Sequence, residues 1–540
     1  MAADSNVTGQ RTLHRNLSVW EAIGISLALM APSMAASINP QGTATTVGRA
    51  VPVAFALAFV GVLLVAYTFV RLTQRFHHSG SVYGFVGATL GPRAGVISGW
   101  ALTGTYVFYA VVTSMAGGRF AANFLNALGA WKNPPTWSGF LLGAIGMLLV
   151  WWIAITPARG GTRLLLAAEA ITVTLIVIVT VIVFVKLAGH SAPHGLGLDW
   201  SVFSLPSGTP LSVIFLGVVF GFLSFAGFEA ASTLGEETRQ PNRDIPRAIL
   251  GVAIFGGIYF FVVTAVEVMG FGTSAKGVTA FINSTSLIGD LGTSYVASWL
   301  GTIITAGAMI SAFGCALACT VGASRLAFAM GRDGILPGRL SHVSERRRTP
   351  TVSAAAIAVS VYAIVAFTWF ILRGDPFTLF LESGVIGTLI LLVVYILATI
   401  GMVRLVFFAG EAGRAAGVSP PSQRPAGGSG GSLPLGGNAG GSGGASPRAG
   451  TVRRWEIVIP VLGIIVLGYT LFRNVWPLPT GVNWWGPSVA IAWFVAGIAW
   501  VLARPAATRR AGELLTRAEG LAGPGGAAAG QLSREGTVTP

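Results

Sequence analysis

The sequence has little charge and very little lysine. Only 10% of its 540 residues are charged, whereas 53% are hydrophobic. An ordinary soluble domain is about 25% charged, so this composition excludes that class. The chain holds only three lysines, at positions 132, 186 and 276. We expect an integral membrane protein that lies in the lipid bilayer.

Cysteine and histidine are also scarce. Cys315 and Cys319 lie four residues apart in one apolar segment, so they share a helix face, and small residues packed between helices explain them best. The six histidines lie outside the apolar segments or at their edges. No phosphate-binding Walker sequence is present. We expect no metal site, no cofactor, no enzyme activity and no ATP-driven transport.

Long apolar runs fill most of the chain. A helix needs about 20 predominantly apolar residues to cross a bilayer, and twelve segments come close to this: 20–48, 50–71, 94–127, 138–156, 164–187, 212–236, 247–271, 296–330, 351–372, 376–408, 456–472 and 484–503. The expected fold class is an all-α integral membrane protein with twelve transmembrane helices.

Positive charge indicates the orientation of these spans. No cleavable signal peptide is expected at the N-terminus. With a cytoplasmic N-terminus, 27 of the 34 Lys and Arg residues fall in cytoplasmic segments, as the positive-inside rule requires. The net charge of +15 is thus a topology signal, and no nucleic-acid partner is expected. We expect a multi-pass protein of the cytoplasmic membrane, with both termini in the cytoplasm.

Composition divides the chain into five parts. A cytoplasmic segment (1–19) precedes a ten-helix core (20–408), and a Gly/Ser-rich flexible cytoplasmic linker follows (409–454). Helices 11 and 12 (455–504) and a disordered cytoplasmic tail (505–540) complete the expected order.

The sixth span is the most informative segment. It contains Glu229 near its middle and Gly227 just before it. A carboxylate at that depth costs about 2.5–3.5 kcal/mol, so by default it faces protein or an aqueous cavity. Gly227 marks a point where the helix can open and free its peptide groups. In the same span, Gly217 and Gly221 favour close approach to a neighbouring helix.

The first span has a corresponding interruption at Ala31-Pro-Ser-Met-Ala-Ala-Ser37. Breaks at matching places in two five-span halves, 20–188 and 212–408, indicate an inverted repeat. The alternative is that Pro and Gly are simply common in membrane helices.

The chain resembles the amino acid–polyamine–organocation (APC) permeases. The matching residues are Phe225-Ala-Gly-Phe-Glu229, Glu236-Glu237, Pro241-Asn-Arg-Asp-Ile-Pro-Arg-Ala-Ile249, Ser324-Arg325, Ala329-Met-Gly-Arg-Asp-Gly-Ile-Leu-Pro337 and Arg348-Thr-Pro350. The resemblance implies a LeuT-like fold with 5+5 inverted repeats, discontinuous helices 1 and 6, and two extra C-terminal helices.

The resemblance also implies a substrate site at the two breaks. Backbone amides around the first break are expected to bind a substrate carboxylate: Ala31, Ser33, Met34, Ala35 and Ala36. Carbonyls of the second break, near Phe225, Ala226, Gly227 and Glu229, are expected to meet the ammonium group. Phe225 and Phe228 are candidates to cover the substrate, although aromatic residues more often only pack.

Two acids are candidates for ion coupling. Some proton-linked relatives place a lysine in the fifth span. In this chain all three lysines are assigned to the outer side or its edge, Lys186 at the end of the fifth span among them, and the acid embedded in that span is Glu169. Glu169 and Glu229 are each expected either to move a proton or to bond a neighbouring helix. The lack of a clear set of oxygen ligands for sodium favours proton coupling or exchange. Charged residues that form either a cytoplasmic gate or solvated surface pairs are Glu236, Glu237, Arg325, Arg332 and Asp333.

These observations predict a secondary active transporter that moves amino acids by alternating access. A polyamine or another organic amine is the alternative substrate, although a site for a dication needs more carboxylates than Glu229 alone supplies. A channel also accommodates broken helices, and only saturation or counterflow kinetics separates it from a carrier.

Overall fold

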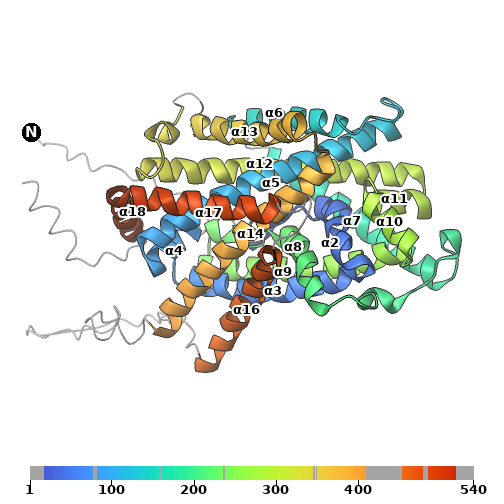
Figure 1. Ribbon diagram of the computed structural model, residues 1–540, viewed down its shortest axis with the longest axis horizontal. Helices are drawn as coiled ribbons and strands as arrows, with labels where there is room; N and C mark the ends of the chain where they lie inside the picture. The colour runs from blue at the N-terminus through green and yellow to red at the C-terminus, as the bar shows by residue number, and fades with distance from the viewer. Residues whose placement is uncertain are drawn as a thin grey trace, which may run out of the picture.

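The computed structural model describes residues 18–76, 82–156, 161–234, 238–344, 347, 349–408, 453–477 and 485–518. The expected N-terminal segment up to residue 17, nearly all of the linker and the end of the tail lie outside these ranges. Long helices, among them α5 and α12, run along the longest axis of the molecule (Figure 1).

Helices account for all the expected spans. Their bounds are α1 Val19–Met30, α2 Pro32–Val47, α3 Val51–Thr73, α5 Pro92–Ala127, α6 Ser138–Ala154, α7 Gly161–Ala188, α8 Ile214–Phe225, α9 Pro241–Phe271, α12 Ser298–Arg332, α13 Thr351–Ala366, α14 Pro376–Val403, α16 Val458–Val475 and α17 Trp485–Ala503.

Ten helical segments of the described chain are long and apolar enough to cross a membrane. The first of them, Val19–Thr73, combines the first two expected spans, and Ser138–Ala154 is a shorter apolar helix. The expected spans therefore coincide with apolar helices, while their number, twelve, stays a prediction.

Short helices between the spans were not predicted. α4 (Val82–Leu90) lies at one end of the bundle, and α10 (Ala275–Asn283) and α11 (Leu287–Tyr295) lie at the other (Figure 1). Each has nine residues. A search for runs of about 20 apolar residues passes over helices of this length.

The expectation of a disordered tail from residue 505 was wrong for its first part. Helix α18 (Pro505–Ala518) follows α17 directly and packs against α4 and α5. Ala, Arg, Leu and Glu favour helix, and Thr508 and Ala511 are buried at this contact. Scattered charge concealed the amphipathic pattern.

Close approaches of glycines bring the core helices together. A Cβ on Gly221 of α8 would lie 2.5 Å from Cβ of Ala58 on α3, and the Thr43 hydroxyl of α2 donates to the carbonyl of Gly217 (3.0 Å). The predicted role of these two glycines in close packing is confirmed.

The contact between α5 and α6 is tighter still. A Cβ on Gly118 would lie 2.1 Å from the carbonyl oxygen of Gly139 and 2.6 Å from the amide nitrogen of Gly143. Backbone atoms cannot move aside as a flexible side chain can. α5 also packs along α12 and α14, so it holds the centre of the bundle.

We expect Gly118→Ala to lower the melting temperature of the purified protein strongly, because overpacking costs about 1–3 kcal/mol or more. Gly146→Ala on α6 is the matched control, since a Cβ there would meet nothing within 4 Å. Differential scanning fluorimetry in detergent measures both. Equal melting temperatures for the two variants would contradict the packing described.

Candidate functional site

The first interruption is a single residue. α1 ends at Met30, α2 begins at Pro32, and Ala31 between them is left-handed, with φ 47° and ψ 59°. Proline lacks an amide hydrogen and suits the first position of a helix, which explains the restart. An alanine with positive φ is uncommon and strained. Ala31 is fully buried, so the surrounding structure must hold it.

Side chains of α7 and α12 bind the amides of the restarted helix. The Ser33 amide donates to Oε1 of Glu169 (2.8 Å), and the Met34 amide donates to Oγ of Ser311 (3.3 Å). A carboxylate at the first turn of α2 also suits the partial positive charge of a helix N-terminus. Glu169 thus joins α7 to the break.

The carbonyls of the break are bound as well. The Cys315 thiol of α12 donates to the carbonyl of Leu29 (3.0 Å), and the Tyr259 hydroxyl of α9 donates to that of Pro32 (3.4 Å). Hydrogen bonds from three different helices therefore replace the intrahelical bonds that the interruption removes.

The second interruption is longer. α8 ends at Phe225, Gly227 has φ 106°, and the chain continues as a 3₁₀ turn, η5 (Ala230–Leu234). The Glu229 carboxylate folds back and accepts a hydrogen bond from the Gly227 amide (3.2 Å). Glycine adopts this φ without the strain that a Cβ would bring, so Gly227 permits the break.

The two interruptions lie against each other. A Cβ on Gly227 would stand 2.8 Å from Cβ of Leu29 and 3.0 Å from its carbonyl carbon. On either side, the Ala231 amide donates to Oγ of Ser26 (3.0 Å), and the Asn39 amide group donates to Oγ of Ser224 (2.8 Å). Two segments about 200 residues apart in the chain thus form one site.

A small cavity opens where they meet. The volume open to the centre of a water molecule is about 20 Å³, enough for one water and too small for an amino acid. Substrate entry therefore requires the lining side chains to move. The lining residues are Leu29, Met30, Met34, Thr105, Tyr106, Tyr109, Val112, Thr113, Leu223, Ala226, Gly227, Glu229, Cys315 and Leu391.

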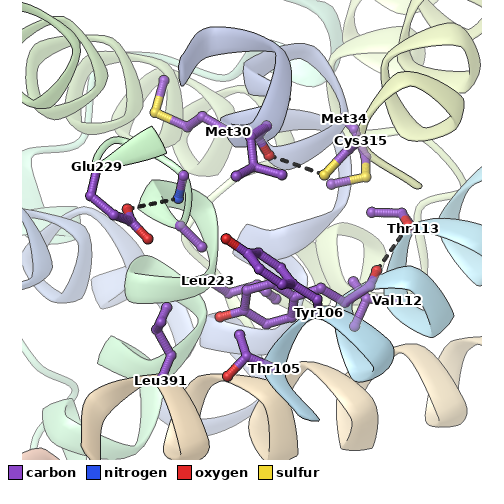
Figure 2. A pocket seen from close by; sticks show the side chains of 14 residues that line it. Met30, Met34, Thr105, Tyr106, Val112, Thr113, Leu223, Glu229, Cys315 and Leu391 are labelled. Carbon is purple, nitrogen blue, oxygen red and sulfur yellow. Dashed lines mark hydrogen bonds between the residues drawn. The ribbon is translucent and has the colours of Figure 1, made fainter. Parts of the chain in front are cut away.

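Figure 2 shows the arrangement around this cavity. Glu229 lies on one side and Thr113 on the other, with the ring of Tyr106 between them and Met30, Met34 and Cys315 on a third side. The Tyr106 hydroxyl makes no hydrogen bond to a described residue, whereas that of Tyr109 bonds Thr388 (3.0 Å). Tyr106 therefore offers a free polar group to a solute.

Some of the predicted binding residues line the cavity and others do not. Met34, Ala226, Gly227 and Glu229 line the cavity, as expected of a site at the breaks. Ala31, Ser33, Ala35, Ala36, Phe225 and Phe228 do not.

The expectation of free amides at the first break does not hold. The amides of Ser33 and Met34 bind side chains, that of Ala31 donates to Leu27 (2.9 Å), and that of Ala35 donates to the carbonyl of Ala31 (2.9 Å). The reason is that a one-residue break leaves only the first turn of α2 without intrahelical partners.

The two phenylalanines pack away from the cavity. The ring of Phe225 contacts Phe260 (5.4 Å between centroids) and Phe59 (6.3 Å). Phe228 packs edge-on against Phe69 (6.0 Å). The turn at Gly227 directs both rings into contacts between helices, which agrees with the alternative that they pack, and a role in covering the substrate stays a prediction.

The two candidate acids differ in position. Glu229 lines the cavity, whereas Glu169 lies outside the lining and holds Ser33. Both side chains are buried. A third buried acid, Glu267 of α9, has no hydrogen-bond partner among the described residues for either carboxyl oxygen.

The candidate gate is seen only in part. Glu236 and Glu237 lie outside the described residues. Asp333 is buried, accepts a hydrogen bond from the Tyr83 hydroxyl of α4 (3.1 Å) and contacts the exposed Arg332 (3.3 Å). Burial, and then the Asp333 charge, raise the pKa of Tyr83. Arg325 is exposed and does not join this cluster.

Sequence reasoning missed the part of the cavity formed by α5. Thr105, Tyr106, Tyr109, Val112 and Thr113 line it, yet no unusual residue marks them in the sequence. Their spacing of three and four residues places them along one helix face, a pattern that many packed membrane helices share.

A helical membrane bundle with two interrupted helices around a central cavity is the architecture of a solute transporter. The sequence pattern of the amino acid permease family matches residues 17–503, nearly the whole chain. The chain therefore belongs to this family of membrane transporters and is a multi-pass membrane protein, not an enzyme.

Individual relatives agree with this assignment. The branched-chain amino acid permease BcaP of Bacillus subtilis is 26% identical over 64% of this chain and 73% of its own length. BcaP of Lactococcus lactis is 26% identical over 68% and 76%. The low-affinity putrescine importer PlaP of Escherichia coli is 26% identical over 66% and 76%.

A solved structure has the same fold. A manganese transporter of Eremococcus coleocola superimposes with a TM-score of 0.50 at 15% identity, covering 94% of this chain and 99% of that one. The likeness concerns the fold alone. The expected LeuT-like class, with interrupted first and sixth spans, is confirmed.

We expect Gly227→Ala to lower both the melting temperature and solute uptake, because the new Cβ would strain a positive φ and press on the Leu29 backbone. Gly314→Ala on α12 is the control, since its nearest neighbour would be Leu165 Cδ1 at 3.9 Å. Equal behaviour of the two variants in fluorimetry and in proteoliposome uptake would contradict the described contact between the breaks.

Proposed function

We propose that this protein is a secondary active transporter that moves amino acids across the cytoplasmic membrane by alternating access, with both termini in the cytoplasm. The single observation that carries the proposal is the cavity between the two interrupted helices, with Glu229 in its lining. In transporters built this way, the substrate site lies near the middle of the membrane, where the interrupted helices meet.

The chemistry of the lining favours an amino acid. Glu229 supplies one negative charge for an ammonium group, and it is the single acid among the residues that line the cavity. Leu29, Leu223 and Met34 supply an apolar surface for a side chain. The names of the BcaP relatives, branched-chain amino acid permeases, agree with such a substrate.

A polyamine is the second candidate, since PlaP is named a putrescine importer. A dication has two positive charges that must both leave water, which is costly without a carboxylate for each. One acid in the lining therefore favours a substrate with one ammonium group. Competition of an amino acid and putrescine for uptake separates the two candidates.

Glu169 is proposed as the residue that couples transport to protons. Its carboxylate holds the Ser33 amide and so fixes α2 to α7. Protonation removes its charge and weakens this charge-assisted hydrogen bond. The break is then less firmly held, and the two halves of the first span gain freedom to move. Exchange of one amino acid for another is the alternative that the same site permits.

We expect Glu229→Gln to abolish or severely reduce uptake of radiolabelled amino acids by proteoliposomes, because the neutral amide cannot balance an ammonium group. Glu382→Gln is the control, as this acid of α14 lies beside Gly486 and outside the cavity lining. Uptake should be assayed with a panel of labelled amino acids, and counterflow distinguishes a carrier from a channel. Normal uptake by Glu229→Gln under every gradient would refute the role of Glu229.

For Glu169, we expect the glutamine and alanine variants to differ. Glu169→Gln keeps an oxygen to accept the Ser33 amide but carries no proton, so it should retain counterflow while uptake stops responding to an inward proton gradient. Glu169→Ala removes the acceptor and leaves the buried Ser33 amide unpaired, which costs about 1–3 kcal/mol of folding free energy. The melting temperature of this variant should therefore also fall. Proton-driven uptake that survives in Glu169→Gln would leave this acid only a structural role.

A further inference from the structure

A second pocket lies at the end of α5, away from the central cavity. It measures about 510 Å³ and is formed by the end of α5, the following loop, the start of α14 and Thr285 between α10 and α11. Its lining is rich in polar groups, including Arg119, Asn123, Thr136 and Asp375. Nothing in the proposed function uses this pocket.

Arg119 lacks the partners that a sheltered guanidinium normally has. One nitrogen, Nη2, donates to the carbonyl of Ser284 (2.6 Å), and the guanidinium carbon lies 4.2 Å from the centre of the Phe377 ring. The other terminal nitrogen, Nη1, is buried without a hydrogen-bond partner. No ion pair joins Arg119 to a carboxylate among the described residues. Arginine presents a fork that suits a carboxylate.

Asp375 supplies the opposite charge in the same pocket. Its oxygens accept hydrogen bonds from the amides of Phe377 (2.9 Å) and Thr378 (3.1 Å) and from the Thr378 hydroxyl (2.5 Å). These bonds cap α14 and fix the carboxylate. Asp375 and Arg119 thus line one pocket, are held by different elements, and form no ion pair with each other.

The pocket and the central cavity share one face of α5. Val112 and Tyr109 line the cavity, whereas Arg119, Asn123 and Asn126 line the pocket. Steps of three, four and seven residues keep these positions on one face. Seven residues from Val112 to Arg119 correspond to about 10 Å along the helix. A solute that leaves one site is therefore close to the other.

We propose that this pocket binds the zwitterionic head group of an α-amino acid, with Arg119 on the carboxylate and Asp375 on the ammonium. Asp375 and Asp290 both act on Arg119 through their charge, but neither pairs directly with its guanidinium. Arg119 and Asp375 therefore still present one group of each sign to a molecule that also carries one of each. The inference rests on the proposed function and adds to it a second recognition site on the path to the central cavity.

The test uses a cysteine introduced at Asn123 in the purified full-length protein. Its labelling is compared with that of the parent protein, in which Cys315 and Cys319 are buried. Two methanethiosulfonate reagents, anionic sulfonatoethyl and cationic trimethylammonioethyl, probe the charges. An equimolar mixture of the proteinogenic amino acids other than cysteine, whose thiol would consume the reagents, serves as the protecting ligand. The same mixture of their methyl esters, which lack the carboxylate, serves as its control.

We expect Arg119→Gln to slow the anionic reagent relative to the cationic one by about tenfold, and Asp375→Asn to change the ratio in the opposite direction, since a charge in a pocket raises the local concentration of an oppositely charged reagent. Asparagine remains a good helix cap, so the second variant keeps its fold. Arg119→Lys should retain the preference for the anion in part. The amino acids should slow labelling, the esters should not, and either charge variant should abolish this protection.

Two results would overturn the proposal: a reagent ratio that is equal in all variants, or labelling that amino acids do not slow. Failure here is distinct from failure of the proposed function. If the wild-type protein takes up amino acids but they do not protect the cysteine introduced at position 123, only the binding site in the pocket at the end of α5 is refuted. Conversely, protection without any uptake refutes transport while the pocket stands.

Discussion

The structure depends on how the peptide groups of the interrupted first span are satisfied. In lipid an unpaired amide or carbonyl costs several kcal/mol, and Ala31 breaks the helix where water is nearly absent. Glu169, Ser311, Cys315 and Tyr259 bind the freed groups from α7, α12 and α9. These bonds add to the packing of α2 against α8 and α12, so the site and the scaffold stabilise each other.

The second interruption is held differently. Gly227 removes the steric cost of a positive φ, and Glu229 satisfies the Gly227 amide within the same segment. The first break is therefore bound to the surrounding helices, while the second is bound largely to itself and to Ser26 of α1. The two halves of the site are therefore held by different kinds of contact, one to neighbouring helices and one mainly within its own segment.

Much of this architecture could be predicted from the sequence. Apolar runs located the spans, and Pro32 and Gly227 located the two interruptions, because these residues restrict or release the backbone in ways that sequence alone reveals. The cavity residues Gly227 and Glu229 followed from the break in the sixth span, and Met34 followed from the family resemblance. The family resemblance supplied the class of protein.

Other features depended on tertiary packing. The hydrogen bond from the Ser33 amide to Glu169 joins residues that are 136 positions apart in the chain. No local sequence pattern reveals such a pairing. The rings of Phe225 and Phe228 turned out to pack between helices, since the direction of a side chain after a break depends on its exact backbone angles. The α5 residues that line the cavity looked like ordinary packing positions, and α18 was concealed by scattered charge.

The length of α5 has a consequence for the expected position, in the bilayer, of the pocket at the end of this helix. Its 36 residues correspond to about 54 Å of helix, compared with about 30 Å for the hydrocarbon layer. The helix must tilt or extend beyond that layer. Arg93 and Arg119 are 26 residues apart, or about 39 Å, which is close to the thickness that includes the lipid headgroups. We therefore expect the two arginines in opposite headgroup regions, which would place the pocket beside Arg119 at the boundary between lipid and water.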